Sequence, residues 1–441
     1  MGKRKEKSPS SVSFGKIFAW GTRPIALGAT TIIVGYLSLY CTDVLHMNPG
    51  LVGVLLMASK VFDGVTDIVA GWIVDNTKTK WGKGRPYELC LIGVWGCMWA
   101  LFAASPDWSI VAKSIWLVIM YTLVFSIFST MLNAAENPYI IRAFKDPVAI
   151  TKVASYSGII ITLGCMIVSI SFPMAIAGAD GASGWRKIMA VYAVVLTVIG
   201  LIRFVFVKEK DDEAGSADVR VSVKDILQVL KSNKYVWLLG IATCIPTLIT
   251  SLAAGSYYFT WIVGDMGKYG TMQMFGMVSM VSMLVFPTLM KRYSGMQMIK
   301  VFSIIGIAGY ILNFFAGGNM ILLTIGFIIS GLSSLPGSYM RTPIIMQLSD
   351  YNEGKGLPRM EGTLGSAVNF MQKIAQGIGS LLCGVLLSIG GYSGALEAQS
   401  GTAIFMIKCL YGLIPAAFLV VVVICACKFK PLDEETFKKS V

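Results

Sequence analysis

The chain has 441 residues, of which 55% are hydrophobic and 14% are charged. A soluble globular protein carries about 25% charged residues. The composition therefore excludes a chain that is soluble throughout, a secreted disulfide scaffold, a coiled coil, a nucleic-acid-binding domain and an enzyme held by one membrane anchor. The net charge of +13 at pH 7 is explained below by the side of a membrane on which the basic residues lie.

Apolar segments long enough to cross a bilayer recur along the whole chain, and a spanning helix takes about 20 residues. The pattern predicts an all-α integral membrane protein with twelve transmembrane helices in two six-helix halves. In chain order, the predicted spans lie near 17–41, 49–74, 87–105, 112–141, 150–177, 188–207, 234–263, 270–290, 298–316, 320–348, 361–390 and 402–427.

The basic residues of the loops are distributed unevenly between the two sides. With a cytoplasmic N-terminus, 27 lie on the cytoplasmic side and four on the opposite side, a bias that favours an even number of spans with both termini in the cytoplasm of a multi-pass cell-membrane protein. Two halves suggest a secondary transporter with a central site between them. The predicted parts are the cytoplasmic tail 1–16, the N-terminal bundle 17–207, the cytoplasmic middle loop 208–233, the C-terminal bundle 234–427 and the cytoplasmic tail 428–441.

The middle loop alternates apolar and polar residues within 221–230. An amphipathic helix lying on the membrane and a solvated linker both fit this pattern.

Six ionisable residues fall inside the predicted spans and away from their ends, where each charge costs about 2.5–3.5 kcal/mol if it faces lipid. They must therefore face a cavity or one another. They are Lys60, Asp63, Asp67, Glu136, Arg341 and Lys373.

Several of these residues lie on polar rows at helical spacing. Lys60, Asp63 and Asp67 follow one another at i, i+3 and i+7. Two further rows comprise Ser129, Asn133 and Glu136 on the fourth span, and Asn369, Gln372, Lys373 and Gln376 on the eleventh.

Structural ion pairs would explain a single pair of such charges. Two carboxylates one turn apart with a third on another helix instead indicate a functional group, because they repel one another unless a proton, a sodium ion or a lysine neutralises them.

Three segments carry a family resemblance. The first is the run from Asp63 to Pro86, which contains a D-x-x-x-D pair and a G-W-x-x-D-x-T-x-x-x-W-G-K turn. The second contains Asp350-Tyr351, Arg359, Glu361-Gly362, Phe370 and Lys373. The third is Tyr40-Cys-Thr42-Asp43-Val44. Together they resemble the glycoside–pentoside–hexuronide:cation symporters of the major facilitator superfamily, typified by melibiose permease.

The resemblance implies roles for individual residues, with sodium or a proton as the coupling ion, no other cofactor and no metal beyond that possible sodium ion. The implied cation-binding residues are Asp63, Thr66, Asp67, Asn133 and Glu136. Substrate binding or coupling is expected at Lys60, Arg341, Lys373, Gln372 and Tyr156. Conformational gating is expected at Gly71, Asp75, Gly82, Lys83, Arg85, Asp350 and Arg359.

Two departures from the family pattern weaken a neutral-sugar assignment. Leu27 stands where members usually carry Asp or Asn, and a common fifth-helix arginine is replaced near Tyr156 or Ser157. A glycoside, pentoside or hexuronide is the expected cargo, with a lysophospholipid or another amphipathic solute as the alternative. We expect a monomeric transporter that contacts its solute, a cation and the bilayer. A polytopic sensor is the non-transport alternative, and we expect neither enzymatic activity nor nucleic-acid binding.

Overall fold

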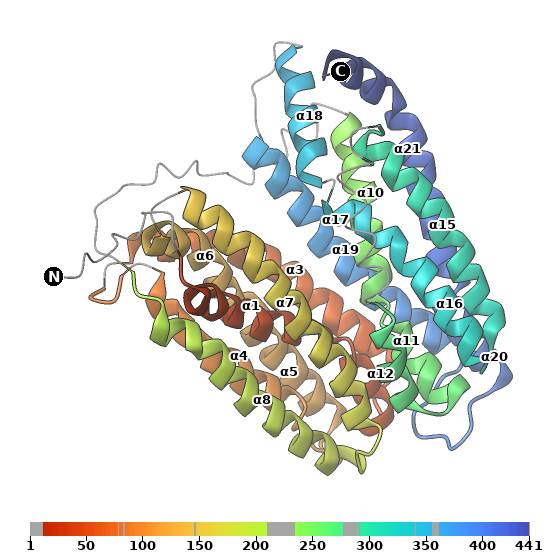
Figure 1. Ribbon diagram of the computed structural model, residues 1–441. Helices are drawn as coiled ribbons and strands as arrows, with labels where there is room; N and C mark the ends of the chain where they lie inside the picture. The colour runs from red at the N-terminus through yellow and green to blue at the C-terminus, as the bar shows by residue number, and fades with distance from the viewer. Residues whose placement is uncertain are drawn as a thin grey trace. The chain divides into compact units, whose positions relative to one another are not determined.

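In the computed structural model, the regular secondary structure of the described residues is helical, apart from one isolated bridge between Thr79 and Gly82. Figure 1 shows long helices joined by short connections. The described residues are 12–77, 79–82, 84–144, 147–209, 234–276, 289, 292–339, 341–354 and 361–440.

The chain divides into two compact units, and the first comprises Met1–Tyr40 and Val61–Ser216. In this unit α1 packs against α7 and α8, and α4 packs against α8 and η3. Its elements are α1 (Phe14–Val34), α2 (Leu37–Leu39), the 3-10 helix η2 (Arg85–Leu89), α4 (Cys90–Leu101), α5 (Ile110–Thr122), the π-helix η3 (Leu123–Ser129), α6 (Thr130–Phe144), α7 (Pro147–Ile176) and α8 (Gly181–Phe206).

The second unit comprises Cys41–Lys60 and Ala217–Val441. The long helix α3 (Pro49–Asn76) therefore begins in the second unit and ends in the first. The other elements are the π-helix η1 (Tyr40–Val44), α10 (Lys234–Ser251), α11 (Ala254–Tyr258), the π-helix η4 (Phe259–Val263), α12 (Met266–Met274), α15 (Gly295–Ala316), α16 (Met320–Gly331), the 3-10 helix η6 (Leu332–Ser334), α17 (Leu335–Tyr339), α18 (Arg341–Gly354), α19 (Glu361–Ile389), α20 (Gly401–Tyr411) and α21 (Leu413–Ser440).

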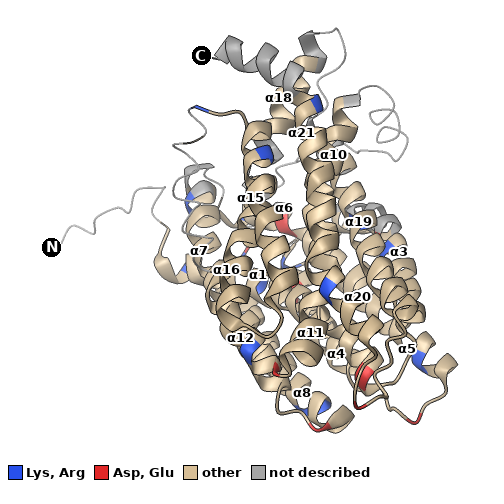
Figure 2. Ribbon diagram, turned by 90° about the vertical axis from the view of Figure 1, so that its right-hand side faces the viewer, with Lys and Arg blue, Asp and Glu red and all other residues tan. Residues whose placement is uncertain are grey.

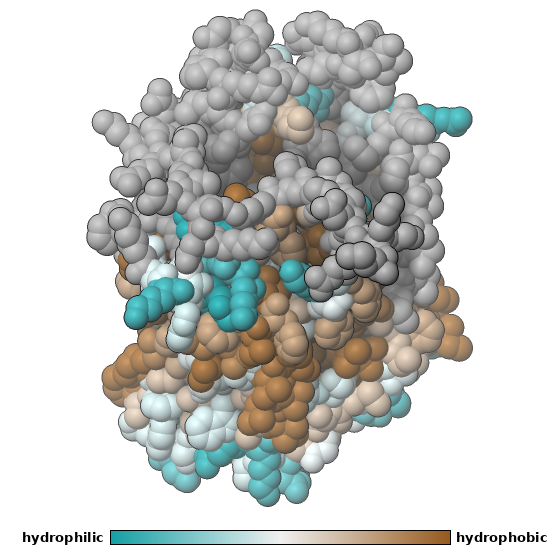
Figure 3. Space-filling view, turned by 60° about the vertical axis from the view of Figure 1, so that its left-hand side comes forward, coloured by the Kyte–Doolittle hydropathy of each residue, from teal (hydrophilic) through white to brown (hydrophobic). Residues whose placement is uncertain are grey.

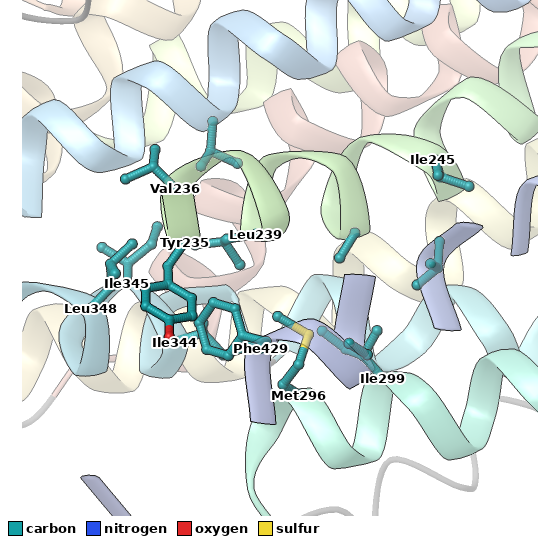
Figure 4. Close-up of a cluster of buried hydrophobic side chains, with 14 of the residues drawn as sticks. Tyr235, Val236, Leu239, Ile245, Met296, Ile299, Ile344, Ile345, Leu348 and Phe429 are labelled. Atoms are coloured by element: carbon teal, nitrogen blue, oxygen red, sulfur yellow. The ribbon is translucent and has the colours of Figure 1, made fainter. Parts of the chain in front are cut away.

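Each unit has its own buried apolar cluster. In the second unit, α10, α15, α18, α19 and α21 contribute side chains to one cluster, in which Tyr235 packs edge-on against Phe429 at 5.3 Å between ring centroids (Figure 4). In the first unit, Trp20 of α1 packs against Tyr139 of α6 at 5.2 Å. The two clusters hold the helices that carry the polar residues described below.

The outward surface is apolar as well. Nine helical stretches among the described residues are long and apolar enough to cross a membrane. Large apolar side chains such as Phe315 and Ile321 are about three-quarters exposed, and Figure 3 shows apolar side chains over much of the described part of one face. Charged residues are sparse along the described helices (Figure 2). Such a surface suits hydrocarbon rather than water.

Side-chain caps explain where several helices begin. The side chains of Ser109, Asn319 and Ser400 accept hydrogen bonds from backbone N–H groups in the first turn of α5, α16 and α20. Ser294 and Gln297 form a reciprocal capping box at the start of α15. These caps satisfy donors that have no partner within the helix.

The helices follow most of the predicted spans, with differences at the ends. The fourth predicted span, 112–141, corresponds to the continuous run of α5, η3 and α6. The sixth helix begins at Gly181 rather than at 188, because Trp185 is buried and stacks on Phe102 at 5.7 Å. This contact draws the segment into the first unit despite the charges of Arg186 and Lys187.

Other predictions lie outside the described residues. They include most of the eighth span, 270–290, and the amphipathic segment of the middle loop. The exact count of twelve spans and the boundaries of the tails, the loop and the halves stay predictions.

Candidate functional site

The buried carboxylate of Asp63 lies in α3, with a side chain from the fourth predicted span beside it. Asp63 is 7% exposed, and Oγ1 of Thr130 at the start of α6 lies 3.4 Å from its Oδ1 and 3.0 Å from the carbonyl oxygen of Phe125, so the carboxylate and this carbonyl are alternative acceptors for one hydroxyl hydrogen. The hydroxyl of Thr66 donates to the backbone carbonyl of Asp63 at 3.0 Å. The structure thus brings one predicted cation ligand to a hydroxyl that the sequence did not single out.

The first half of α3 packs closely on α19 through glycines. A Cβ added at Gly53 would meet the backbone of Ser380 and Leu381 at 2.9–3.1 Å, and one added at Gly384 would meet the carbonyl oxygen of Pro49 at 2.2 Å. Small residues let membrane helices approach this closely. The approach positions polar side chains of the two helices for direct contact.

Lys60 and Gln376 make that contact. The Nζ of Lys60 donates a hydrogen bond to Oε1 of Gln376 at 2.9 Å. One turn earlier on α19, Gln372 donates from Nε2 to the carbonyl of Thr243 at 3.4 Å, and Lys373 is partly buried beside it. The polar row predicted on the eleventh span therefore forms on one helix and meets α3 and α10.

A second cluster of charges joins four helical elements of the first unit. The guanidinium of Arg203 in α8 lies 2.8 Å from Oε2 of Glu136 in α6, and the Arg23 guanidinium in α1 also contacts that oxygen. Both guanidiniums face Oε1 of Glu88 in η2, at 3.6 Å from Arg23 and 3.7 Å from Arg203. Two positive and two negative charges are thus held together, and Glu136, at 30% exposure, is the most accessible of the four.

Aromatic rings and backbone carbonyls complete the surroundings of this charge network. The guanidinium carbon of Arg203 lies 3.2 Å from the Trp20 ring centroid and 4.8 Å from that of Tyr139. The hydroxyl of Tyr139 donates to the carbonyl of Val207 at 2.7 Å. These contacts tie α6 to the end of α8.

The predicted gating turn is held by Glu209, which lies three residues past the end of α8. The carboxylate of Glu209 accepts hydrogen bonds from the backbone N–H groups of Gly84, at 3.0 Å, and Arg85, at 3.4 Å. Arg85 in turn donates from Nε to the carbonyl of Phe204 at 3.0 Å. Gly82 has a φ of +106°, and a Cβ there would overlap the Glu209 carboxylate, so only glycine fits.

The Tyr-x-Thr-Asp segment lies where the chain passes from the first unit to the second. Tyr40 donates a hydrogen bond to the carbonyl of Ala104 at 3.0 Å in the first unit. In the second unit, Asp43 accepts from Tyr392 and, at 3.1 Å, from Nε1 of Trp261. Thr42 Oγ1 also donates to Asp43 at 2.7 Å, so one short segment carries polar contacts in each unit.

The remaining predicted site residues are either exposed on their helices or have side chains outside the described part of the structure. Asn133 is exposed on α6, and Tyr156 is 57% exposed on α7. The backbones of Asp67, Gly71, Asp75, Arg341 and Asp350 are helical, but their side chains are not among those described, and Lys83 and Arg359 lie outside the described residues.

Sequence reasoning missed Arg23, Glu88, Arg203 and Glu209 because they lie near the ends of predicted spans, where a charge needs no explanation. A signal was present for three of them. Arg23 falls inside the first predicted span, Glu88 opens the third and Arg203 closes the sixth. Residues Arg23, Glu88, Glu136 and Arg203 are called the charge network below.

Comparison with known proteins places the chain in a family. The model of the family described as MFS/sugar transport protein matches residues 19–434. An isoprimeverose transporter of Lactiplantibacillus pentosus is 25% identical over 87% of this chain and 82% of its own. A glucuronide carrier protein homolog of Escherichia coli is 23% identical over 92% of this chain and 90% of its own. A putative glycoside/cation symporter of the same organism is 25% identical over 88% and 84%.

Solved structures show the same fold. A bacterial homologue of the human lysosomal transporter Spinster, in an inward-facing conformation, matches 97% of this chain and 99% of its own with a TM-score of 0.69 and 13% identity. The family match spans both units, and the relatives align over nearly their full lengths. The chain therefore belongs to the MFS/sugar transport protein family, the glycoside–pentoside–hexuronide:cation symporter type within the major facilitator superfamily.

Proposed function

We propose that the chain is a cation-coupled symporter of a small organic solute, a glycoside, pentoside or hexuronide, that works by alternating access. It spans the cell membrane twelve times with both termini in the cytoplasm, as the distribution of basic residues favours. Membership of a sugar-transport family and likeness to a putative glycoside/cation symporter support the coupled mechanism.

The observation that carries this proposal is the buried carboxylate of Asp63, in a helix that the sequence predicts to span the membrane. A charge at mid-bilayer costs about 2.5–3.5 kcal/mol on insertion scales. A sodium ion or a proton bound with Asp63 and Asp67 offsets that cost, and the Thr130 hydroxyl lies within reach of the same group. Binding of the ion is thereby linked to the stability of one conformation over another.

The ion-free conformation needs another positive charge near the carboxylates, and we assign this role to a lysine of α3 or α19. Lys373 lies on the polar row of α19, and Lys60 already contacts Gln376 of that row. In the absence of the ion, a lysine ammonium takes its place beside the carboxylates. Ion and lysine then compete for one site, and the ion concentration sets the balance between the two states.

The charge balance favours an anionic solute. The charge network is neutral by itself, because two arginines face two glutamates. Of the six charges that the sequence places away from the span ends, Lys60, Arg341 and Lys373 then remain against Asp63 and Asp67, so a bound cation leaves an excess of positive charge. An arginine can hold a carboxylate by two parallel hydrogen bonds. A uronide satisfies this preference, which likeness to a glucuronide carrier homolog supports.

Uptake into proteoliposomes tests the proposal. Purified protein is given labelled glycosides and uronides with an imposed sodium or proton gradient, and protein-free liposomes serve as the control. Accumulation above equilibrium that collapses when the gradient is dissipated is expected, with uronides competing better than neutral disaccharides. Equilibration without a gradient requirement would contradict cation coupling, and stronger competition by neutral disaccharides would contradict the anionic preference.

A further inference from the structure

Glu136 was expected to bind the coupling cation, but its surroundings suit a different role. Its Oε2 contacts the guanidiniums of both Arg23 and Arg203. A cation bound to this carboxylate would lie beside two fixed positive charges, which would repel it. Glu88 meets the same two guanidiniums through a single oxygen, Oε1. Both glutamates therefore belong to one neutral network, in which the side chain of Glu88 is buried and that of Glu136 is 30% exposed.

The same helix does contact the predicted cation site, at a different residue. Oγ1 of Thr130, at the first position of α6, lies 3.4 Å from Oδ1 of Asp63. Glu136 follows six residues later, which corresponds to about 9 Å along a helix axis. The charge network thus holds α6 about two turns from the point where α6 meets the Asp63 carboxylate.

We propose that Glu136 is a positioning residue and not a ligand of the coupling cation. Together with Arg23, Glu88 and Arg203 it fixes α6 against α1, η2 and α8, so that Thr130 is presented to Asp63. The network also keeps its own charge at zero near the cation site. This inference rests on the proposed cation coupling at Asp63 and changes which fourth-helix residue serves it.

Charge variants distinguish a positioning role of Glu136 from a ligand role. A positioning role depends on the net charge of the whole charge network, whereas a ligand role depends on the Glu136 carboxylate itself. Glu136→Gln leaves one uncompensated positive charge. Taking the rise of about 9 Å from Thr130 to Glu136 as the separation and an effective dielectric constant of about 20, that charge weakens cation binding roughly twentyfold. Glu88→Gln changes the network by the same charge and is the matched control. The double variant Arg23→Gln with Glu136→Gln is neutral again.

The measurement is the cation concentration that gives half-maximal uptake in proteoliposomes, with the melting temperature recorded for each variant. Glu136→Gln is expected to raise that concentration roughly twentyfold and Glu88→Gln to raise it in the same direction, whereas the double variant should return to within about threefold of the parent with coupling intact. If a single variant fails to fold, the comparison of the double variant with the remaining single variant decides.

Two outcomes overturn the inference. A double variant that stays as impaired as Glu136→Gln, while Glu88→Gln behaves as the parent, would make Glu136 a ligand. Single variants that both leave the half-maximal concentration unchanged would remove the positioning role. Asp63→Asn is measured in parallel. If this variant retains ion-dependent accumulation, the proposed function fails. If it loses accumulation and either of the two outcomes just described is found, only the positioning role of Glu136 is refuted.

Discussion

The guanidinium of Arg203 lies against the face of the Trp20 ring, 3.2 Å from its centroid. Arg203 is fully buried in the last part of α8, and Trp20 lies in the first part of α1. A cation over an aromatic face gains about 2 kcal/mol when both are desolvated. The contact therefore joins α1 to α8 at the position where Arg203 also meets Glu136.

Replacing the ring tests that contribution. Trp20→Leu removes both the aromatic face and buried apolar area, and we expect a loss of roughly 3–5 kcal/mol of stability. Trp20→Phe keeps an aromatic face and should lose less. Thermal unfolding in detergent measures both. Equal losses in the two variants would show that the cation–π contact contributes nothing beyond packing.

The turn at Gly82 provides a test of local fit. Gly82→Ala places a Cβ at a φ of +106° and onto the Glu209 carboxylate, so we expect a loss of about 2–3 kcal/mol. Gly181 also has a positive φ, +50°, with nothing within 4 Å of an added Cβ. Gly181→Ala is therefore the control for a Cβ added at a positive φ without a clash. The melting temperature should fall further for Gly82→Ala, and an equal fall would refute the clash with Glu209.

The Asp43 carboxyl predicts a dependence of stability on pH. Burial raises its pKa above the ordinary value, while hydrogen bonds from Tyr392, Thr42 and Trp261 and the charge of His46 oppose part of that rise. Because the folded-state pKa exceeds the unfolded value of about 3.9, the stabilisation is fully present below that pH. It is lost as the pH rises through the folded-state pKa.

The corresponding measurement is the melting temperature of Asp43→Asn as a function of pH. As the pH rises from about 3.9 through the folded-state pKa of Asp43, the parent should lose stability relative to this variant, because only the parent acquires the buried charge. The exposed Asp107 provides the control Asp107→Asn, which should follow the parent. An Asp43→Asn profile parallel to the parent would contradict this assignment.

The hydrogen bond from Lys60 to Gln376 can be tested by isosteric change. Gln376→Leu leaves the Lys60 ammonium without this acceptor, and hydrogen bonds to charged groups contribute about 1.5–3 kcal/mol. Gln372→Leu, which removes a neutral bond of 3.4 Å to the Thr243 carbonyl, should cost less, about 0.5–1.5 kcal/mol. Thermal unfolding compares the two, and a larger loss for the Gln372 variant would contradict this ranking.

The helical fold was largely predictable because the length of an apolar segment is a property of a whole helix. This signal survives errors of several residues at the ends. The start of α8 was misplaced because Arg186 and Lys187 looked like the border of a span, whereas the aromatic stacking of Trp185 extends the helix past them. Such a contact joins distant residues and cannot be read from local composition.

The site was predictable only in part. Asp63 and the row on α19 carry a helical spacing that the sequence displays, and the structure places them on single helices. The charge network has no such spacing, because Arg23, Glu88, Glu136 and Arg203 come from four elements that meet only on folding. A threonine inside an apolar span carries no charge that would mark it in the sequence. The contact of Thr130 with Asp63 depends on how α6 packs against α3.

The central claim is that the carboxylate of Asp63 couples ion binding to transport. The most direct measurement is ion-driven accumulation of a labelled uronide in proteoliposomes containing Asp63→Asn, with binding of the solute measured on the same preparation. The account predicts that solute binding and melting behaviour are retained while accumulation above equilibrium is lost. A full ion-dependent accumulation ratio in the Asp63→Asn variant would contradict it.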